Sequence, residues 1–219
     1  MRAYKFLDDK YGIDSLRSRR LKQSRVADLD DPFELTPYDI TDYTLRMAFL
    51  KTRADVDKNR GLLCFSAHWK NPVIWAHYSD KHKGLCLGFE LPELNDDPKS
   101  NTGRVTYLPK LLPFPTNFEQ MSDREHDAFA RGAIFTKFEH WIYEEEIRVW
   151  GPLENEESGL YFVPFGKDLQ LAEVIVGQRC TVSKAEIVSA LGSLAGKVKI
   201  SRARAAYDKF EMVEDQGSW

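Results

Sequence analysis

The chain has 219 residues, of which 42% are hydrophobic and 30% are charged, and this composition excludes a disordered protein. A net charge of −3 gives no global reason to expect nucleic acid or an anionic membrane as a partner. No apolar run reaches the roughly 20 residues that span a bilayer, and the N-terminal residues do not resemble a signal peptide. Three widely spaced cysteines without a CxxC pair are typical of a reducing compartment. We therefore expect a single cytoplasmic domain over residues 1–219, with no membrane partner.

Apolar periodicity predicts an alternation of strands and helices in the first half of the chain. One helix begins at Asn71, which caps free N–H groups, and Pro72 occupies its first turn, where a missing N–H costs nothing. Gly84 ends that helix, and an alternating strand follows it. In chain order we expect a strand at 3–7, a helix at 12–20, a loop at 28–34, a helix at 40–53 with Ile40, Tyr43, Met47, Ala48 and Leu50 on its apolar side, a strand at 62–66, a helix at 71–80 and a strand at 85–90.

Strands dominate the second half of the chain. Residues 91–120 hold five of the ten prolines, which predicts a loop insertion around one strand at 103–108. Ser183 and Glu186 have the spacing of a capping box that opens a helix to about residue 194. The other expected elements are a helix at 122–131 and strands at 146–150, 160–165, 172–177 and 197–201. Because no regular βαβ alternation is present, we predict an α+β fold in which mixed, mostly antiparallel sheets with inserted helices form a cleft.

The segment 141–150 (WIYEEEIRVW) is the first candidate for chemistry. If residues 144–150 form a strand, alternate side chains point to the same face. The side chains on one face are then Glu144, Glu146, Arg148 and Trp150. This face is either solvated, with an ion pair of Arg148, which is the more common case, or it faces a ligand. In the second case a carboxylate binds a sugar hydroxyl or stabilises a developing positive charge, and Arg148 fixes its position.

The segment 62–90 is the second candidate. Ser66 stands at the end of a strand, just before a helix, where it is either a ligand contact or a turn serine. Trp75, His77 and Tyr78 combine apolar surface with a polar group, and we expect at least one of them at the margin of a binding site. We expect no metal, because HExxH and CxxC are absent, and no P-loop or GxGxxG is present.

Two basic clusters complete the candidates. Runs of this kind are mostly solvated, but clusters that flank a binding site suit a pyrophosphate or an RNA backbone. The first basic cluster comprises Arg17, Arg19, Arg20, Lys22 and Arg25. The second basic cluster comprises Lys197, Lys199, Arg202, Arg204 and Lys209.

Taken together, these motifs resemble the domain-of-unknown-function-2971 family of prokaryotic proteins. The resemblance spans most of the chain, although Asp30 stands where the family usually has Asn. The shared landmarks are residues 4–6 (YKF), 30–34 (DDPFE), 64–66 (CFS), 75–89 (W-x-H-Y…K-G-x-C-x-G-F), 141–148 (W-x-Y-E-x-E-x-R) and 173–177 (EVIVG).

The order of these landmarks is also similar to that of the ADP-ribosyltransferases. The resemblance implies an ADP-ribosyltransferase-like fold in which NAD, a substrate, lies across the cleft. The third motif of those enzymes, E-x-E, matches Glu144 and Glu146. On this resemblance Glu146 binds the ribose 2′-hydroxyl and stabilises the oxocarbenium-like transition state as nicotinamide leaves, and Glu144 orients or deprotonates the acceptor.

The first two motifs of the ADP-ribosyltransferases imply which residues of this chain bind NAD. Tyr78 or Trp75 stacks on nicotinamide, and Lys5 stands where the family has a basic residue or His. The full set expected to hold NAD is Lys5, Arg25, Ser66, Trp75, His77, Tyr78 and Arg148.

Three functions follow as hypotheses. The first is ADP-ribosylation of a macromolecule, protein or nucleic acid, by a toxin or defence effector that has a neutralising partner protein. The second is a metal-dependent nuclease that uses Asp31, Glu144 and Glu146 as magnesium ligands. The third is a non-catalytic module that binds a nucleotide or a partner.

Overall fold

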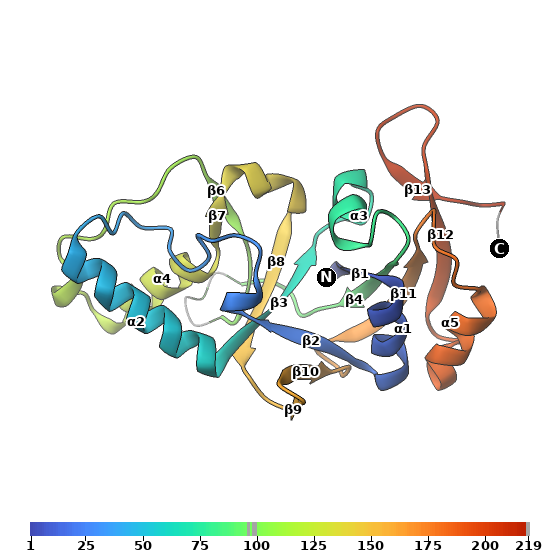
Figure 1. The fold of residues 1–219 in the computed structure, drawn as a ribbon, viewed down its shortest axis with the longest axis horizontal. Helices are drawn as coiled ribbons and strands as arrows, with labels where there is room; N and C mark the ends of the chain where they lie inside the picture. The colour runs from blue at the N-terminus through green and yellow to red at the C-terminus, as the bar shows by residue number, and fades with distance from the viewer. Residues whose placement is uncertain (96, 98–99, 218–219) are drawn as a thin grey trace. The chain divides into compact units, whose positions relative to one another are not determined.

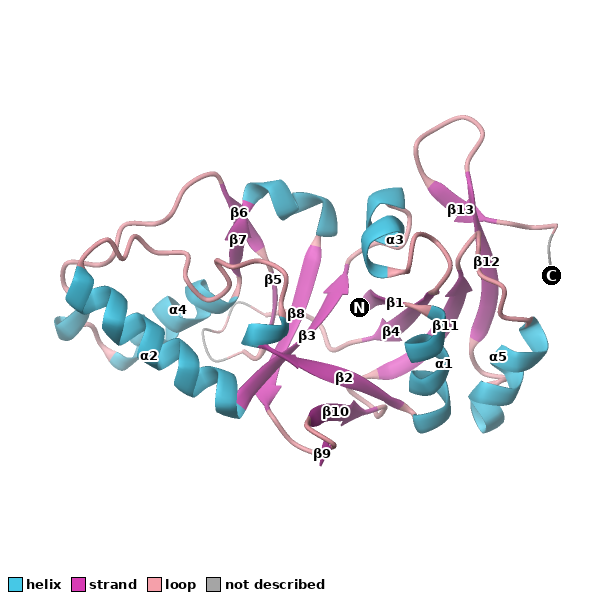
Figure 2. Ribbon diagram, in the orientation of Figure 1, coloured by secondary structure: helices cyan, strands magenta, loops and turns pink. Residues whose placement is uncertain are grey.

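The computed structural model describes residues 1–95, 97 and 100–217, and within these the chain forms two compact units. Unit 1 comprises Met1–Lys22, Phe65–Glu93 and Val163–Trp219, and unit 2 comprises Gln23–Cys64 and Leu94–Phe162. Neither unit is one continuous stretch of chain. The structure defines each unit separately, so the single domain and the cleft remain predictions. The predicted α+β class is confirmed: helices accompany mixed, mostly antiparallel sheets (Figure 2).

Unit 1 is built on a sheet in which the neighbouring strands run in the order β13-β12-β11-β4-β1 (Figure 1). β11 and β12 are parallel, and the other neighbours are antiparallel. The end of β3 (Arg60–Ser66) adds Ser66 opposite Tyr4. The elements are β1 Arg2–Leu7, α1 Asp9–Ser18, α3 Pro72–Tyr78, β4 Leu85–Glu90, β11 Gln170–Val176, α5 Lys184–Leu191, η4 Gly192–Leu194, β12 Lys199–Ala205 and β13 Met212–Glu214.

Helices α1 and α3 lie on opposite faces of this sheet. Gly12 of α1 lies against Leu85 of β4, whereas Trp75 of α3 packs edge-on against Phe6 of β1 with the ring centroids 5.1 Å apart. Phe6 pairs with Cys86, one residue beyond Leu85, and consecutive residues of a strand point to opposite faces. A strand covered on both faces is apolar throughout, and Leu85–Phe89 is buried at every position.

Unit 2 contains a smaller set of antiparallel strands flanked by two helices. β8 pairs with both β3 and β5, and β2 pairs with β3. β6 and β7 form a short parallel pair. The elements are η1 Val26–Asp28, α2 Tyr43–Asn59, β5 Thr102–Arg104, β6 Thr106–Leu108, η2 Phe118–Gln120, α4 Asp123–Ile134, β7 Thr136–Phe138, η3 Glu139–Glu144, β8 Glu146–Pro152 and β9 Glu156–Glu157, with β2 (Arg20–Arg25) and β10 (Leu160–Pro164) divided between the units.

Local sequence signals set several element ends as predicted. The Asn71 side chain accepts a hydrogen bond from the backbone N–H of Val73, and Pro72 is the first residue of α3. Ser183 caps α5 by accepting from the N–H of Glu186. The single strand expected at 103–108 is instead two short strands, β5 and β6, and residues 96 and 98–99 of the expected insertion lie outside the described residues.

The apolar face predicted for the helix at 40–53 is wrong for Tyr43, Met47 and Leu50, whereas Ala48 does line a cavity in unit 2. Asp42 caps α2, so the helix begins at Tyr43 rather than at Ile40. Tyr43, Met47 and Leu50 are 67%, 48% and 45% exposed. The face that turns inward instead is the one that bears the half-buried Leu45, Phe49 and Val56. In the part of the chain that the structure describes, no helix combines the length and apolar composition needed to cross a membrane.

Candidate functional site

The charged row predicted at 144–150 is not one strand. Glu144 is the last residue of η3, Glu145 adopts a left-handed backbone (φ 43°), and β8 begins at Glu146. The left-handed residue changes the chain direction, so Glu144 reaches the site from a separate element. Glu146 and Arg148 are on one side of β8, as a period of two requires.

Arg148 is the centre of a buried cluster of charges within unit 2. Its side chain is fully buried. Its Nε donates to Oε1 of Glu146 at 2.9 Å and its Nη2 donates to Oε2 of the same carboxylate at 3.0 Å, which is the bidentate geometry of a strong ion pair. Nη2 also lies 2.6 Å from Oε1 of Glu34, and Nη1 donates to the carbonyl of Ile134 at 2.5 Å.

Lys137 is the second cation of this cluster. Its ammonium group donates to Glu144 at 2.7 Å and lies 3.6 Å from both Glu34 and Glu146. It also stands 4.5 Å from the centre of the Trp141 ring, a distance typical of a cation–π contact. The solvated strand face is therefore excluded for these residues, whereas the expected ion pair of Arg148 is confirmed. We call Glu34, Lys137, Glu144, Glu146 and Arg148 the charge cluster.

The charge cluster contains three carboxyl groups and two cations, and its pKa values differ accordingly. Burial raises the pKa of Glu34, and the nearby Arg148 does not fully offset this. Burial also acts to raise the pKa of Glu146, but Arg148 and Lys137 outweigh it and leave that pKa below its ordinary value. Among the described residues, Oε2 of Glu34 is buried without a hydrogen-bond partner. Glu34 therefore takes up a proton more readily than Glu146.

The candidates from the segment 62–90 belong to unit 1, and most of them have structural contacts. The hydroxyl of Ser66 donates to the carbonyl of His68 at 2.9 Å and accepts from its N–H, which agrees with a turn serine. Trp75 is fully buried, and its Nε1 donates to the carbonyl of Trp69. Its indole has no exposed face for nicotinamide, so the stacking role predicted for Trp75 disagrees with its burial.

The remaining candidates keep some exposure. His77 is exposed and Tyr78 is half-buried, with their rings edge to face at 6.2 Å. Lys5 is half-buried on β1, opposite Leu87. Arg25 belongs to unit 2 and lies 3.9 Å from Asp28 in a partly exposed ion pair. The structure thus assembles Glu144, Glu146 and Arg148, and leaves the roles of the other candidates as predictions.

The second basic cluster is largely offset by carboxylates of the same region. Lys199 pairs with Glu214 at 2.5 Å, and Lys209 pairs with Glu211 at 2.9 Å. Arg202 donates to the carbonyl of Cys180. This pattern agrees with a solvated face more than with a surface for phosphates.

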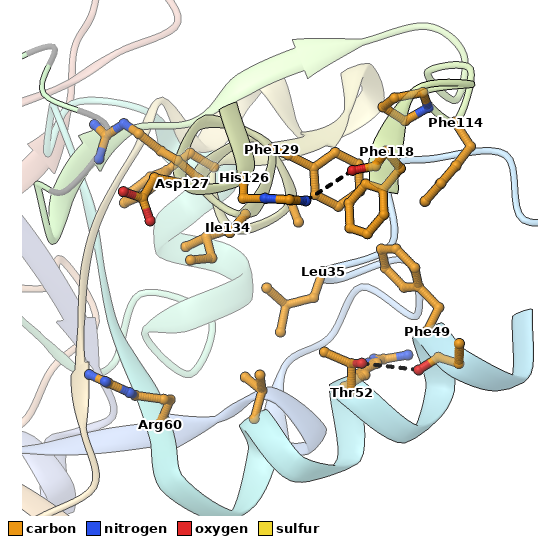
Figure 3. A pocket seen from close by; sticks show the side chains of 18 of the residues that line it. Leu35, Phe49, Thr52, Arg60, Phe114, Phe118, His126, Asp127, Phe129 and Ile134 are labelled. Carbon is orange, nitrogen blue, oxygen red and sulfur yellow. Dashed lines mark hydrogen bonds between the residues drawn. The ribbon is translucent and has the colours of Figure 1, made fainter. Parts of the chain in front are cut away.

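Sequence reasoning missed a large cavity in unit 2. It has a volume of about 1250 Å³, and its walls come from α2, α4, residues 114–120 and the adjoining ends of β3 and β8 (Figure 3). Four phenylalanines, Phe49, Phe114, Phe118 and Phe129, form its most apolar part. The missed signal is a second apolar stripe on α2, in which Leu45, Phe49 and Val56 share one helical face.

Comparison with known protein families gives a match to part of the chain. Residues 74–149 match the model of a family described as "Protein of unknown function (DUF2971)". Over this segment the chain is similar to the DUF2971 family. No curated protein and no solved structure matches the chain.

The DUF2971 segment covers roughly a third of the chain and includes parts of both units. Lys137, Glu144, Glu146 and Arg148 lie inside it, and Glu34 lies outside. Helix α4 of the cavity is also part of the DUF2971 segment, whereas α2 is not. The family match therefore includes four of the five residues of the charge cluster and only one of the two helices that line the cavity.

The magnesium site expected for a nuclease does not form. Over residues 1–95, 97 and 100–217, no group of three or more His, Cys, Asp or Glu side chains is placed to hold a metal ion. Glu144 and Glu146 are instead bound to Lys137 and Arg148. A carboxylate neutralised by a protein cation is a poor ligand for magnesium, which requires several oxygen ligands in near-octahedral geometry.

Proposed function

We propose that the protein is a binding module whose unit 2 takes a small apolar molecule into the cavity between α2 and α4. The observation that carries this proposal is the cavity itself. Its volume of about 1250 Å³ lies above the roughly 300–1000 Å³ of most small-molecule sites, and apolar side chains line most of it. Apolar surface covered by a ligand contributes about 25 cal/mol per Å².

The aromatic walls give the cavity a defined shape. Phe114 and Phe129 are edge to face with their centroids 5.6 Å apart, and Phe118 and Phe129 are edge to face at 5.0 Å. Phe49 meets Phe114 at 6.4 Å. These contacts hold the rings in fixed orientations, which reduces the entropy lost when a ligand binds.

Small lining residues provide a direct test. Ala48 of α2 and Ala130 of α4 line the cavity, so Ala48→Phe and Ala130→Phe place a ring in the ligand volume. We expect the wild-type protein to bind the neutral fluorescent probe N-phenyl-1-naphthylamine, and each variant to bind it at least about tenfold more weakly. The measurement is a fluorescence titration.

Each variant has a matched control on its own helix. Ala54 of α2 and Ala128 of α4 are exposed and do not line the cavity, so Ala54→Phe and Ala128→Phe change helix propensity equally. We expect both controls to bind the probe like the wild type. Absence of probe binding by the wild type, or equal binding by all five proteins, would contradict the proposal.

ADP-ribosyl transfer from NAD is a second candidate function, and the convergence of the E-x-E carboxylates favours it. Glu144 and Glu146 lie 2.7 Å and 3.6 Å from the same ammonium group, that of Lys137. The low pKa of Glu146 keeps it ionised, as a group that stabilises an oxocarbenium-like ribose must be. An ADP-ribosyltransferase-like fold, a macromolecular acceptor, a cytoplasmic location and a role in toxicity or defence belong to this candidate.

ADP-ribosyl transfer requires that the hydrogen bonds between Glu146 and Arg148 in the charge cluster rearrange. Both oxygens of Glu146 accept hydrogen bonds from Arg148, and the side chain is 5% exposed. One of these bonds has to be exchanged for a ribose hydroxyl before the glycosidic bond of NAD breaks, nicotinamide leaves and the acceptor nucleophile bonds to the ribose.

The test of this candidate is incubation with labelled NAD and a cell extract. We expect label transfer and nicotinamide release by the wild type and loss of both in Glu146→Gln. Glu145→Gln is the matched control, because Glu145 is adjacent in sequence and exposed. No label transfer and no nicotinamide release by the wild type would remove this candidate and would leave the binding function untouched.

A further inference from the structure

The cavity of unit 2 has two chemically different ends. The rings of Phe49, Phe114 and Phe118 gather at one end, and Arg60 and Asp127 lie at the other (Figure 3). A cavity of this kind distinguishes the two ends of a bound molecule, because apolar groups gain from the first end and charged groups from the second.

Arg60 differs from the other arginines that line the cavity. Arg131 donates to the carbonyls of Ser100 and Thr102, at 2.5 Å and 3.1 Å, and Arg53 donates to the carbonyl of Pro32 at 3.4 Å. Within the part of the chain that the structure describes, the guanidinium of Arg60 has neither a hydrogen bond nor an ion pair.

The position of Arg60 is fixed by the backbone. It is the C-cap of α2 and the first residue of β3, and its N–H donates to the carbonyl of Val56. The side chain is exposed, so it stands where the cavity opens to solvent. A guanidinium in this place is available to carboxylate or phosphate oxygens, with which it forms bidentate hydrogen bonds.

The aromatic end favours a hydrocarbon over a nucleobase. A buried base has several donors and acceptors that need partners, and each one left unpaired costs free energy. The four phenylalanine rings offer no hydrogen-bond partner, and Nε2 of His126 is already engaged with the carbonyl of Phe118 at 3.0 Å. An alkyl or acyl chain needs no partner there.

From these observations we propose that the cavity binds an amphiphile that has a hydrocarbon tail and an anionic head group. The tail lies among Phe49, Phe114, Phe118 and Phe129, and the head group meets the guanidinium of Arg60. This inference rests on the proposed binding function of unit 2 and specifies the class of its ligand.

Displacement of N-phenyl-1-naphthylamine by single-chain amphiphiles tests the inference. We use 12-carbon chains below their micelle concentrations: dodecanoate and dodecyl phosphate as anions, dodecanol as the neutral compound, and dodecyltrimethylammonium as the cation. We expect at least one anion to displace the probe at a concentration about tenfold lower than dodecanol, and the cation to be weakest. The two anions distinguish a carboxylate head from a phosphate head.

Substitution of Arg60 tests whether its guanidinium group binds the anionic head group of the ligand. We expect Arg60→Gln to weaken displacement by the preferred anion about tenfold more than it weakens displacement by dodecanol. Arg104→Gln is the matched control, because Arg104 is an exposed arginine of unit 2 that does not line the cavity.

The outcomes separate this inference from the function on which it rests. Equal displacement by anion, alcohol and cation, or an anion preference that Arg60→Gln leaves intact, overturns the inference and keeps the apolar binding site. Failure of the wild type to bind the probe overturns the proposed function itself.

Discussion

Substitution of Gly84 by alanine is expected to be the most damaging single change in unit 1. A Cβ atom at this position would lie 2.0 Å from the carbonyl oxygen of Leu7 and 2.8 Å from Cα of Asp8. Both are backbone atoms, so no side-chain rotation relieves the overlap. We expect Gly84→Ala to lower the free energy of unfolding by about 4 kcal/mol, measured by urea denaturation.

The turn before Gly84 leaves the backbone little freedom to adjust. Asp80, Lys81 and His82 all have positive φ values, of 40°, 55° and 71°, which L-residues rarely adopt in succession. The N–H of His82 donates to the carbonyl of Trp75 at 3.1 Å. The N–H of Gly177 donates to Gly84 itself at 2.9 Å. A shift that accommodates a methyl group therefore disrupts a turn that is already strained.

Two other glycines of unit 1 serve as controls. Around Gly166 and Gly196, an added Cβ would meet no atom within 4 Å, and neither residue has a positive φ. Gly166→Ala and Gly196→Ala are expected to change the free energy of unfolding by less than about 0.5 kcal/mol. If Gly84→Ala were as stable as these controls, the close approach of Leu7 would not be a real constraint.

Local signals explain which parts of the fold follow from the sequence. Asn71 with Pro72 predicts the start of α3 because the side chain of the first and the missing N–H of the second both suit a helix N-terminus. Ser183 defines the start of α5 for the same kind of reason. These interactions join residues within three positions of each other, so the sequence alone contains them.

The charge cluster could not be predicted in the same way, because its partners are distant in sequence. Glu34 and Arg148 are separated by 114 residues, and only the fold brings them to 2.6 Å. The left-handed Glu145 breaks the strand that the pattern E-x-E-x-R suggested. Periodicity also does not say which of two apolar stripes on a helix faces inward, and on α2 the stripe of Tyr43, Met47 and Leu50 faces solvent.

Loss of Arg148 is expected to be the most damaging change in unit 2. Arg148→Met keeps much of the side-chain volume but leaves Glu146 and Glu34 buried without their hydrogen bonds to Arg148. Lys137, 3.6 Å from both carboxyl groups, is the cation of the cluster that remains. Removal of one partner of a buried ion pair costs about 3–5 kcal/mol. We expect a loss of that size in urea denaturation at pH 7.

Two further variants show whether the loss comes from unpaired charge. Arg104→Met, which removes an exposed arginine of the same unit, is expected to change stability by less than about 0.5 kcal/mol. The double variant Glu146→Gln, Arg148→Met removes both members of the pair, and we expect it to be less destabilised than the sum of the two single variants. Strict additivity would mean that the two side chains do not stabilise each other.

The stability that Arg148→Met loses relative to the wild type is expected to depend on pH, and the direction of this dependence shows whether the loss is electrostatic. In the wild type the pKa of Glu146 lies below its ordinary value, so its contribution to stability is present above the unfolded pKa, about 4.3, and is lost as pH falls through the folded pKa. Without Arg148, only Lys137 opposes the effect of burial, so the pKa of Glu146 is expected to rise and that of Glu34 to rise further. The folded variant then binds more protons than its unfolded state above about pH 4.3, so its stability falls as pH rises.

The loss of stability of Arg148→Met relative to the wild type is therefore expected to be larger at pH 8 than at pH 5. A deficit equal at both pH values would assign the loss to packing around Arg148 instead of to its charge.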